Sequence, residues 1–295
     1  MAPDRADQPA TARKAVQAGP LDQRLGLFSY FGYELPLDRR LAMIRRAGFW
    51  HTALWWGPPE PLFAQGRGHE GPDLARAQGL SVQNLHATFE DSNDLWSPQP
   101  SVRHAFLRRK LDCLADCTRH GVGCLVMHVT HGKGAPDPTP DGLALMRELA
   151  AAARDAGVRL AIENTRRDDI VAAVLGVIDE SGIAGLCYDS SHDWLWGAPR
   201  TALLARWGHR LLQTHLSDCD AGEIDRHALP GDGCVGWDQV AAAFPRDSYA
   251  GCLMLEVMPA GVSDRLAPEA FLEQAMQRAR WLGGLLTGGP GEAAR

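Results

Sequence analysis

Lysine is scarce in this chain, and its scarcity limits the partners that the protein can have. Only three of the 295 residues are lysines, so arginine supplies most of the positive charge, and the formal net charge is −6. Proteins that bind the phosphate backbone of nucleic acids usually carry a broad basic surface. The composition therefore favours a small-molecule partner over nucleic acid, without excluding the latter.

Long apolar runs and paired cysteine motifs are also missing. No apolar run approaches the roughly 18 residues that a membrane helix needs. The seven cysteines include no Cys-x-x-Cys pair, which favours reduced thiols over a disulfide framework. The first residues carry charges but not the apolar core of a signal peptide. We therefore expect a cytoplasmic protein without membrane association, and a disordered extension over residues 1–23.

A helical pattern, a glycine and a short apolar segment follow one another repeatedly along the chain, and this order predicts the fold. Several short apolar segments follow a glycine that suits the left-handed residue closing a helix, as at Gly79 and Gly157. Eight apolar segments alternate with eight helical patterns. The predicted strands lie at 25–29, 51–55, 82–86, 124–128, 160–163, 186–189, 211–215 and 252–256. The predicted helices lie at 36–47, before Gly79, and at 103–120, 140–156, 168–181, 199–207, 237–244 and 268–286.

This alternation predicts an α/β protein with parallel strands. Crossover connections join such strands, and eight strand–helix units close into a (β/α)8 TIM barrel. A doubly wound open sheet is the competing arrangement. Because no linker divides the chain, we predict a single barrel domain over residues 24–286, followed by a flexible, glycine-rich tail over residues 287–295.

Six consecutive predicted strands end in a histidine, an aspartate or a glutamate. The carboxyl ends of the strands share one face of a parallel barrel, where catalytic residues lie. Buried charges and imidazoles need partners, so side chains that converge there indicate one or more bound divalent cations. The strand-end residues are His86, His128, Glu163, Asp189, His215 and Glu256, and the adjoining loops add His192, Asp225 and His227.

The residue types narrow the choice of metal. Three carboxylates and one imidazole, from Glu163, Asp189, His215 and Glu256, suit one ion of Mn, Co, Mg or Zn. The remaining candidates would make the set rich in imidazole, which favours zinc or a site of up to three ions. Whether these residues bind further metal or the substrate stays open: His86, His128, His192, Asp225 and His227.

The same segments carry a resemblance to a known family. HATF, AIEN, YDSSH, THLSDCD followed by DRHALPGDG, and LEV occur in the order and spacing of the xylose isomerase-like TIM-barrel superfamily, which the chain resembles over residues 25–286. The resemblance is to its sugar phosphate isomerase/epimerase group and, in ligand pattern, to endonuclease IV. For the epimerases it implies one metal held by Glu163, Asp189, His215 and Glu256, with the two glutamates as catalytic acid and base. For endonuclease IV it implies nine ligands around three zinc ions, and all nine have a candidate here.

We therefore predict a divalent-metal-dependent isomerase or epimerase of a sugar or sugar phosphate, which abstracts a proton next to a metal-bound carbonyl. Aromatic residues after the third and sixth strands, Trp96, Trp194 and Trp196, would wall the substrate pocket, and Arg226 would contact the substrate. The alternatives are a zinc phosphodiesterase (an AP endonuclease), a dehydratase or lyase, and a non-catalytic sugar-binding barrel. The acidic balance argues against the nuclease.

Two further points concern residues outside this set. Arg166 and Arg167 follow the fifth strand, and we interpret them as surface charges at a helix start, with a phosphate contact as the alternative. The sequence also leaves open whether two copies pair into a homodimer.

Overall fold

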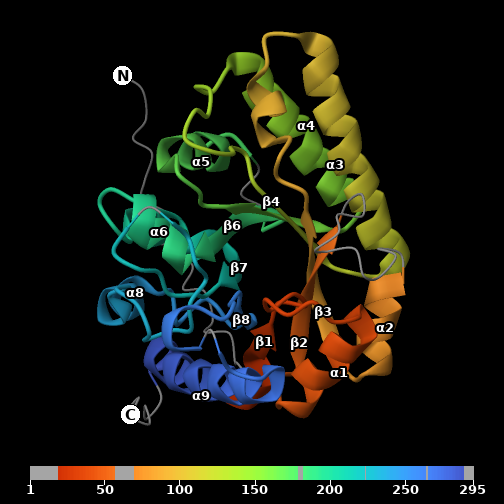
Figure 1. The fold of residues 1–295 in the computed structure, drawn as a ribbon. Helices are drawn as coiled ribbons and strands as arrows, with labels where there is room; N and C mark the ends of the chain where they lie inside the picture. The colour runs from red at the N-terminus through yellow and green to blue at the C-terminus, as the bar shows by residue number, and fades with distance from the viewer. Residues whose placement is uncertain (1–18, 57–69, 179–181, 223, 264, 289–295) are drawn as a thin grey trace, which may run out of the picture.

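Eight parallel strands form one sheet that is rolled into a barrel (Figure 1). This computed structural model describes residues 19–56, 70–178, 182–222, 224–263 and 265–288. The strand order is β7-β6-β5-β4-β3-β2-β1-β8. The strands are β1 Leu25–Leu27, β2 His51–Trp56, β3 Ser81–Ala87, β4 Cys124–Met127, β5 Arg159–Glu163, β6 Ala184–Asp189, β7 Leu211–His215 and β8 Leu253–Leu255. The predicted single-domain TIM barrel is confirmed, and the open sheet is wrong.

The barrel closes between β7 and β8. Just beyond β7, the Leu216 N–H donates to the Met254 carbonyl at 2.9 Å, and the Glu256 N–H donates to the Leu216 carbonyl at 3.2 Å. Earlier in the strand, the Thr214 hydroxyl replaces main-chain pairing: it donates to the Cys252 carbonyl at 3.2 Å and accepts from the Met254 N–H at 3.1 Å. This closure places Glu256 beside the end of β7.

Nine α-helices surround the barrel within the described part of the chain (Figure 1). They are α1 Leu37–Arg46, α2 Gly71–Ala77, α3 Pro100–His120, α4 Pro140–Asp155, α5 Asp168–Leu175, α6 Ser190–Trp196, α7 Ala202–Trp207, α8 Trp237–Ala243 and α9 Pro268–Thr287. The expected glycine punctuation is present, since Gly121 adopts the left-handed conformation (φ 62°) that closes α3. None of the helices in the described residues could span a membrane.

Two helical features differ from the sequence prediction. The helix predicted over 168–181 ends at Leu175, and residues 179–181 lie outside the described part of the chain. The seven-residue helix α6 was not predicted. It starts directly at the end of β6, where the Asp189 carboxylate accepts from the His192 N–H at 2.8 Å as its N-cap. Because α6 follows β6 without a turn, no glycine or proline marks the boundary, and the sequence therefore gives no sign of where the helix begins.

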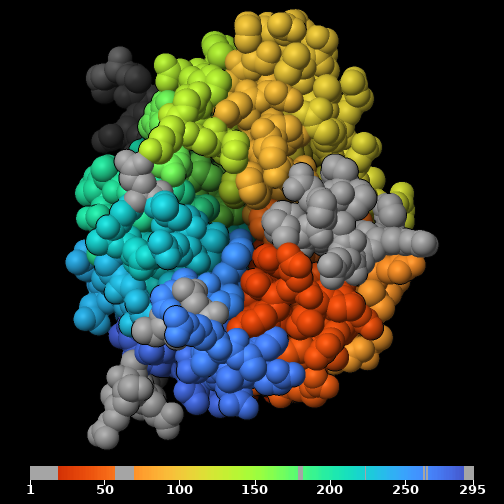
Figure 2. Space-filling view, in the orientation of Figure 1, coloured from red at the N-terminus to blue at the C-terminus, as the bar shows by residue number. Residues whose placement is uncertain are grey.

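The first described residues pack against the last helix. The 3-10 helix Leu21–Arg24 leads into β1, and Asp22 pairs with Arg280 of α9 at 3.1 Å. The N-terminal and C-terminal segments accordingly lie side by side, as the red and blue regions of Figure 2 show. The extension predicted over residues 1–23 thus overlaps this helix at its end. Residues 1–18 of that extension and 289–295 of the predicted tail lie outside the described residues.

A close approach between β6 and β7 depends on a glycine. Gly185 of β6 has no side chain, so the Arg210 carbonyl oxygen approaches its backbone to a point that a Cβ atom would overlap. The buried Arg210 guanidinium reinforces the contact by donating to the Ala184 carbonyl at 2.8 Å and to the Leu175 carbonyl at 2.8 Å. This junction fixes the start of β7, and hence the position of the residues at its end.

We predict that Gly185→Ala lowers the free energy of unfolding by about 1–3 kcal/mol, because the added methyl group must push β6 and β7 apart. The matched control is Gly123→Ala, since an added Cβ at Gly123 meets nothing within 4 Å. That variant should change stability by less than about 1 kcal/mol. Urea unfolding of both variants measures the difference, and equal stabilities would contradict the role of the close approach.

Candidate metal centre

The candidate residues converge because they share one register. Side chains alternate between the two faces of a strand, so residues two apart point to the same side. Small buried residues such as Val126, Ala161 and Cys187 pack together apart from the main core. The predicted ligands stand two residues later in each case: His128, Glu163 and Asp189. Gln213 and His215 are likewise two residues apart, as are Met254 and Glu256, so each pair points to the same side of its strand. The strand ends therefore place these groups at the mouth of the barrel.

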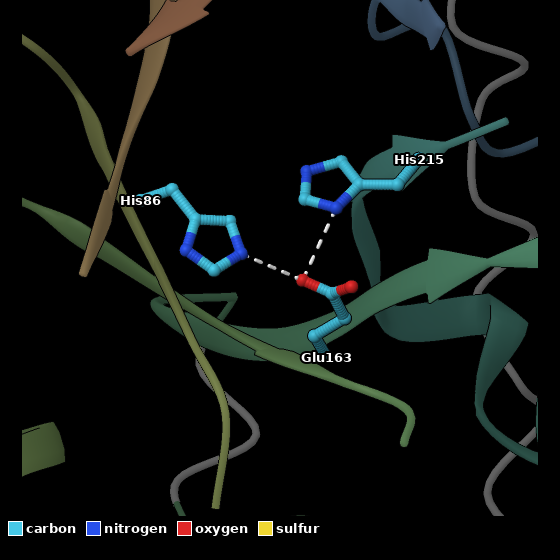
Figure 3. Close-up of side chains that lie close together, drawn as sticks. All are labelled: His86, Glu163 and His215. Atoms are coloured by element: carbon cyan, nitrogen blue, oxygen red, sulfur yellow. Dashed lines mark hydrogen bonds and ion pairs between the residues drawn. The ribbon is translucent and has the colours of Figure 1, made fainter. Parts of the chain in front are cut away.

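One carboxylate oxygen, Glu163 Oε2, is the centre of this arrangement. The Nε2 atom of His86 lies 2.9 Å from it and the Nδ1 atom of His215 lies 3.1 Å from it, so the two rings approach it from different strands (Figure 3). His128 Nε2 lies 3.3 Å away. Burial would raise the pKa of Glu163, but His215 and His128 outweigh it and hold the pKa well below the usual range. The carboxylate is thus kept charged in a buried place.

Two further carboxylates complete a compact cluster. Glu256 Oε2 lies 2.9 Å from His215 Nδ1, so this imidazole nitrogen faces two glutamates at once. Ligand atoms of Glu163, Asp189, His215 and Glu256 all lie within 4.8 Å of one another, as do those of His86, Glu163 and His215. All five residues are buried. The four residues predicted as ligands of one ion are therefore brought together, and His86 adjoins them.

The hydrogen bonding of the cluster fits a divalent cation. Asp189 Oδ2 and both ring nitrogens of His215 are buried, and none has a hydrogen-bond partner among the described residues. The short distances from His215 Nδ1 to Glu163 and Glu256 therefore reflect atoms that face a common point without a well-directed hydrogen bond. Unpaired buried polar atoms of this kind cost about 1–3 kcal/mol each. Three carboxylates and an imidazole are also a donor set that Mn, Co, Mg and Zn accept.

His86 is held in the manner of a ligating histidine. Its Nδ1 atom lies 2.8 Å from the Ala87 carbonyl oxygen, which can only accept a hydrogen bond, so Nδ1 carries a proton and the Nε2 atom faces Glu163 Oε2 at 2.9 Å. Metal-binding histidines commonly donate their second ring N–H to a carbonyl in this way. His86 thus has the geometry of either an additional ligand or a group that orients Glu163.

His192, Asp225 and His227 form a second group beside the cluster. Asp225 Oδ2 lies 2.9 Å from His192 Nε2 and 3.2 Å from His227 Nε2. Burial would raise the pKa of Asp225, but His227 and His192 hold it far below the usual range. His192 also approaches Glu163 Oε1 at 3.5 Å. These three residues therefore pair with one another, and His192 contacts the Glu163 carboxylate at the edge of the cluster.

A buried aspartate shapes the loop that carries Asp225 and His227. The Asp218 carboxylate accepts hydrogen bonds from the Cys219, Gly231 and Val235 N–H groups and from the Trp237 indole N–H, at 2.8–3.0 Å. His227 itself adopts a left-handed backbone (φ 48°), uncommon outside glycine, and its Nδ1 lies 3.1 Å from the Glu256 carbonyl oxygen. The loop is thus fixed by three main-chain donors and one indole that no sequence pattern reveals.

A cavity of about 340 Å³ opens above the cluster. Glu163, Glu256, His86, His128, His192, Asp225 and His227 all line it. Its remaining walls are partly aromatic and partly polar. They comprise Trp55, Phe89, Thr130, His131, Gly132, Thr165, Arg166, Trp196 and Met258. Such a mixture of apolar walls and convergent polar groups is typical of a small-molecule site.

The structure places three predicted substrate contacts elsewhere. Trp96 is buried in the core, and its indole N–H donates to the Val129 carbonyl at 2.7 Å. Trp194 lies under Arg200, whose guanidinium is 4.8 Å from the ring centroid. Arg226 pairs with Asp220 at 3.0 Å. None of these three lines the cavity. Of the two tryptophans of helix α6, Trp196 lines the cavity and Trp194 does not, because the helix turns Trp196 towards the cavity and Trp194 away from it.

Comparison with known proteins defines the class. A family model described as xylose isomerase-like TIM barrel matches residues 41–282, and the chain belongs to this family. Among curated proteins, the uncharacterized protein y4fM of Sinorhizobium fredii (strain NBRC 101917 / NGR234) is 38% identical over 76 residues. That match covers 26% of this chain and only 24% of the relative's length.

Solved structures show the same fold at low identity. A D-psicose 3-epimerase from Clostridium cellulolyticum H10 superimposes with a TM-score of 0.68 at 15% identity, covering 89% of this chain and 99% of that one. An L-ribulose 3-epimerase gives 0.69 at 19%, covering 90% and 94%. The IolI protein, solved with a zinc atom, gives 0.64 at 16%, covering 90% and 98%. At these identities the likeness establishes the fold alone.

We predict that Mn²⁺ affinity rises with pH. Burial raises the pKa of Asp189 to about 6, and the pKa of His215 is also raised, because Cys187 and the carboxylates of Glu163 and Glu256 outweigh burial. Both must lose a proton to act as ligands, so protons compete with the metal. Below pH 6 the affinity should fall about tenfold per pH unit for each proton displaced. Chelator-competition titrations between pH 5 and 8 measure the slope of log affinity against pH. In the Asp189→Asn variant this slope should be smaller by the one proton that Asp189 releases. A pH-independent affinity would contradict the assignment.

Proposed function

We propose that this protein is a divalent-metal-dependent isomerase or epimerase of a sugar or sugar phosphate. The observation that supports this most directly is the pair of buried glutamates, Glu163 and Glu256, that both face His215 and both line the cavity. Inverting a carbon centre by proton transfer uses one group to remove the proton and a second group to return one from the opposite face. Membership of the xylose isomerase-like family, and the fold shared with two 3-epimerases, support the same class.

Glu163, Asp189, His215 and Glu256 would hold one ion of Mn, Co, Mg or Zn. When bound there, the metal would polarise a substrate carbonyl oxygen and make the neighbouring C–H more acidic. The two candidate ligand groups share Glu163 and His215, which supports one ion as the resident cofactor.

The two glutamates have unequal surroundings, which suggests unequal roles. Both oxygens of Glu163 have imidazole neighbours, at 2.9–3.3 Å for Oε2 and 3.5 Å for Oε1. Glu256 contacts His215 through Oε2, while its Oε1 has no hydrogen bond or ion pair among the described residues. Glu256 would therefore remove the proton through Oε1. Glu163, beside several imidazoles that can supply protons, would return one to the substrate.

The walls of the cavity suit a small polyol. Trp55 and Phe89 pack against His86 and His128, with ring centroids 4.3 and 5.0 Å apart respectively. Their apolar faces would cover the C–H side of a sugar, while the imidazoles offer donors to its hydroxyl groups. The ring stacking also limits the freedom of the two histidines.

A three-zinc phosphodiesterase is the second candidate. His192, Asp225 and His227 line the same cavity, as the endonuclease IV pattern requires. Their mutual pairing through Asp225, and the acidic balance of the chain, favour the one-ion site. A lyase would share the proton abstraction. The cytoplasmic location and pairing into a homodimer stay predictions.

We predict that Glu256→Gln lowers turnover about 10²–10⁴-fold while the protein keeps its metal, because an amide oxygen can still act as a ligand but cannot accept the proton. Proton NMR in deuterated water measures this as exchange of carbon-bound hydrogens in a panel of ketoses and their phosphates. The matched control is Glu148→Gln, an exposed glutamate of α4, which should exchange normally. Undiminished exchange in metal-loaded Glu256→Gln would contradict the two-glutamate mechanism.

A further inference from the structure

Two cysteines flank the segment that brings Asp225 and His227 to the cavity. This segment belongs to the connection between β7 and α8 (Figure 1). Cys219 stands six residues before Asp225, and Cys234 stands seven residues after His227. Both cysteines are free thiols, and the proposed proton transfer uses neither of them. A bond between the two sulfur atoms would enclose both cavity residues in one covalent ring.

The two thiols face each other at short range. Cys219 Sγ lies 3.8 Å from Cys234 Sγ, and the Cys234 N–H donates to the Cys219 carbonyl oxygen at 2.8 Å. That main-chain hydrogen bond keeps the two Cα atoms within about 7 Å, the range that a disulfide can bridge. The sulfur atoms need to move about 1.8 Å closer to bond. Rotation about the two Cα–Cβ bonds supplies such a movement.

The main chain around both cysteines is fixed by the buried carboxylate of Asp218. Its Oδ1 atom accepts from the Cys219 N–H and from the Val235 N–H, next to Cys234, both at 2.9 Å. Gly233 permits this approach, because a Cβ atom there would overlap the Cys219 carbonyl oxygen and the Asp218 carboxylate. The proximity of the two thiols is therefore built into the loop.

The two thiols differ in their access to solvent. Cys234 is exposed, whereas Cys219 is 0% exposed. Burial and the neighbouring Cys234 thiol raise the pKa of Cys219. Because the thiolate is the attacking species and needs access to its target, a reagent in solution reacts at Cys234 first. Cys219 then lies beside the modified sulfur, in the position of a resolving thiol.

We propose that Cys219 and Cys234 form a redox-sensitive dithiol whose oxidant is a low-molecular-weight disulfide, RSSR. The Cys234 thiolate attacks one sulfur of RSSR, forms a mixed disulfide and releases RS⁻. The Cys219 thiolate then attacks Cys234 Sγ and releases the second RS⁻. The two protons lost by the cysteines pass through solvent to the released thiolates, so the protein is oxidised by two electrons and RSSR is reduced to two RSH. The new bond restrains the loop around Asp225 and His227.

Oxidised glutathione is the probe for this reaction. The folded protein should lose the mass of two hydrogen atoms on incubation with it, and dithiothreitol should restore the original mass. Trypsin locates the bond after the remaining thiols are alkylated and the chain is unfolded, because it cleaves at Arg226, between the two cysteines. Peptides 211–226 and 227–246 should stay joined until they are reduced. The absence of a disulfide, or a disulfide between other cysteines, would overturn the proposal.

Single serine variants provide the matched controls. Cys234→Ser should form no disulfide, whereas Cys113→Ser should react like the wild type, because the half-buried Cys113 lies in α3, outside the loop. Cys219→Ser should stop at the mixed disulfide, with one glutathione on Cys234. A disulfide in the Cys234→Ser protein, or its loss in the Cys113→Ser protein, would contradict the pairing.

Proteolysis of the folded protein tests the restraint on the loop. Trypsin cuts a folded chain through local opening, which a cross-link around the cleavage site opposes. Cleavage at Arg226 should be at least about tenfold slower in oxidised than in reduced wild-type protein. The same two treatments should leave the rate in Cys234→Ser unchanged. Equal rates in oxidised and reduced wild-type protein would show that the bond does not restrain the loop. Neither mass nor cleavage rate involves turnover, so both measurements are independent of the proposed function.

Discussion

The structure depends on how a buried negative charge at Glu163 is compensated. Moving a carboxylate from water into the protein interior costs roughly several kcal/mol, even after the surrounding protein relaxes. Here imidazoles from β3, β7 and the end of β4 lie at 2.9–3.3 Å from one oxygen, and those of His215 and His128 keep the group ionised. The same convergence leaves Asp189 and His215 with buried atoms that lack a hydrogen-bond partner among the described residues. A divalent cation would satisfy those atoms and the charge together, which is why the metal-binding and proton-transfer proposals are inseparable.

The register of the barrel strands brings the candidate ligands together around Glu163. Each candidate ligand follows an interior-facing residue of its strand by two positions, so a slip of one residue would point the ligand into the helix layer. The Thr214 hydroxyl at the β7–β8 seam and the close approach at Gly185 fix the two strands that carry His215 and Asp189. Residues remote from the cavity thus determine whether the four ligands meet.

The sequence predicts the strand ends well and the loop positions poorly. Glu163 and Asp189 end their strands and His86 is the last residue but one of β3, so the parallel alternation alone predicts that they meet. The choice between Trp194 and Trp196 depends instead on a seven-residue helix without a start signal of its own. Likewise Arg166 and Arg167 look equivalent until Asp137, thirty residues away, is seen to pair with the second. Side-chain direction beyond a strand end is set by tertiary contacts that no local pattern records.

Anomalous diffraction from crystals grown with Mn²⁺ would show whether the Glu163 cluster binds one divalent ion, because it locates and counts the metal without reference to activity. One strong peak is expected within about 2.0–2.3 Å of oxygen or nitrogen atoms of Glu163, Asp189, His215 and Glu256. A cluster without a peak, or additional peaks between His192, Asp225 and His227, would show that the single-ion site is wrong.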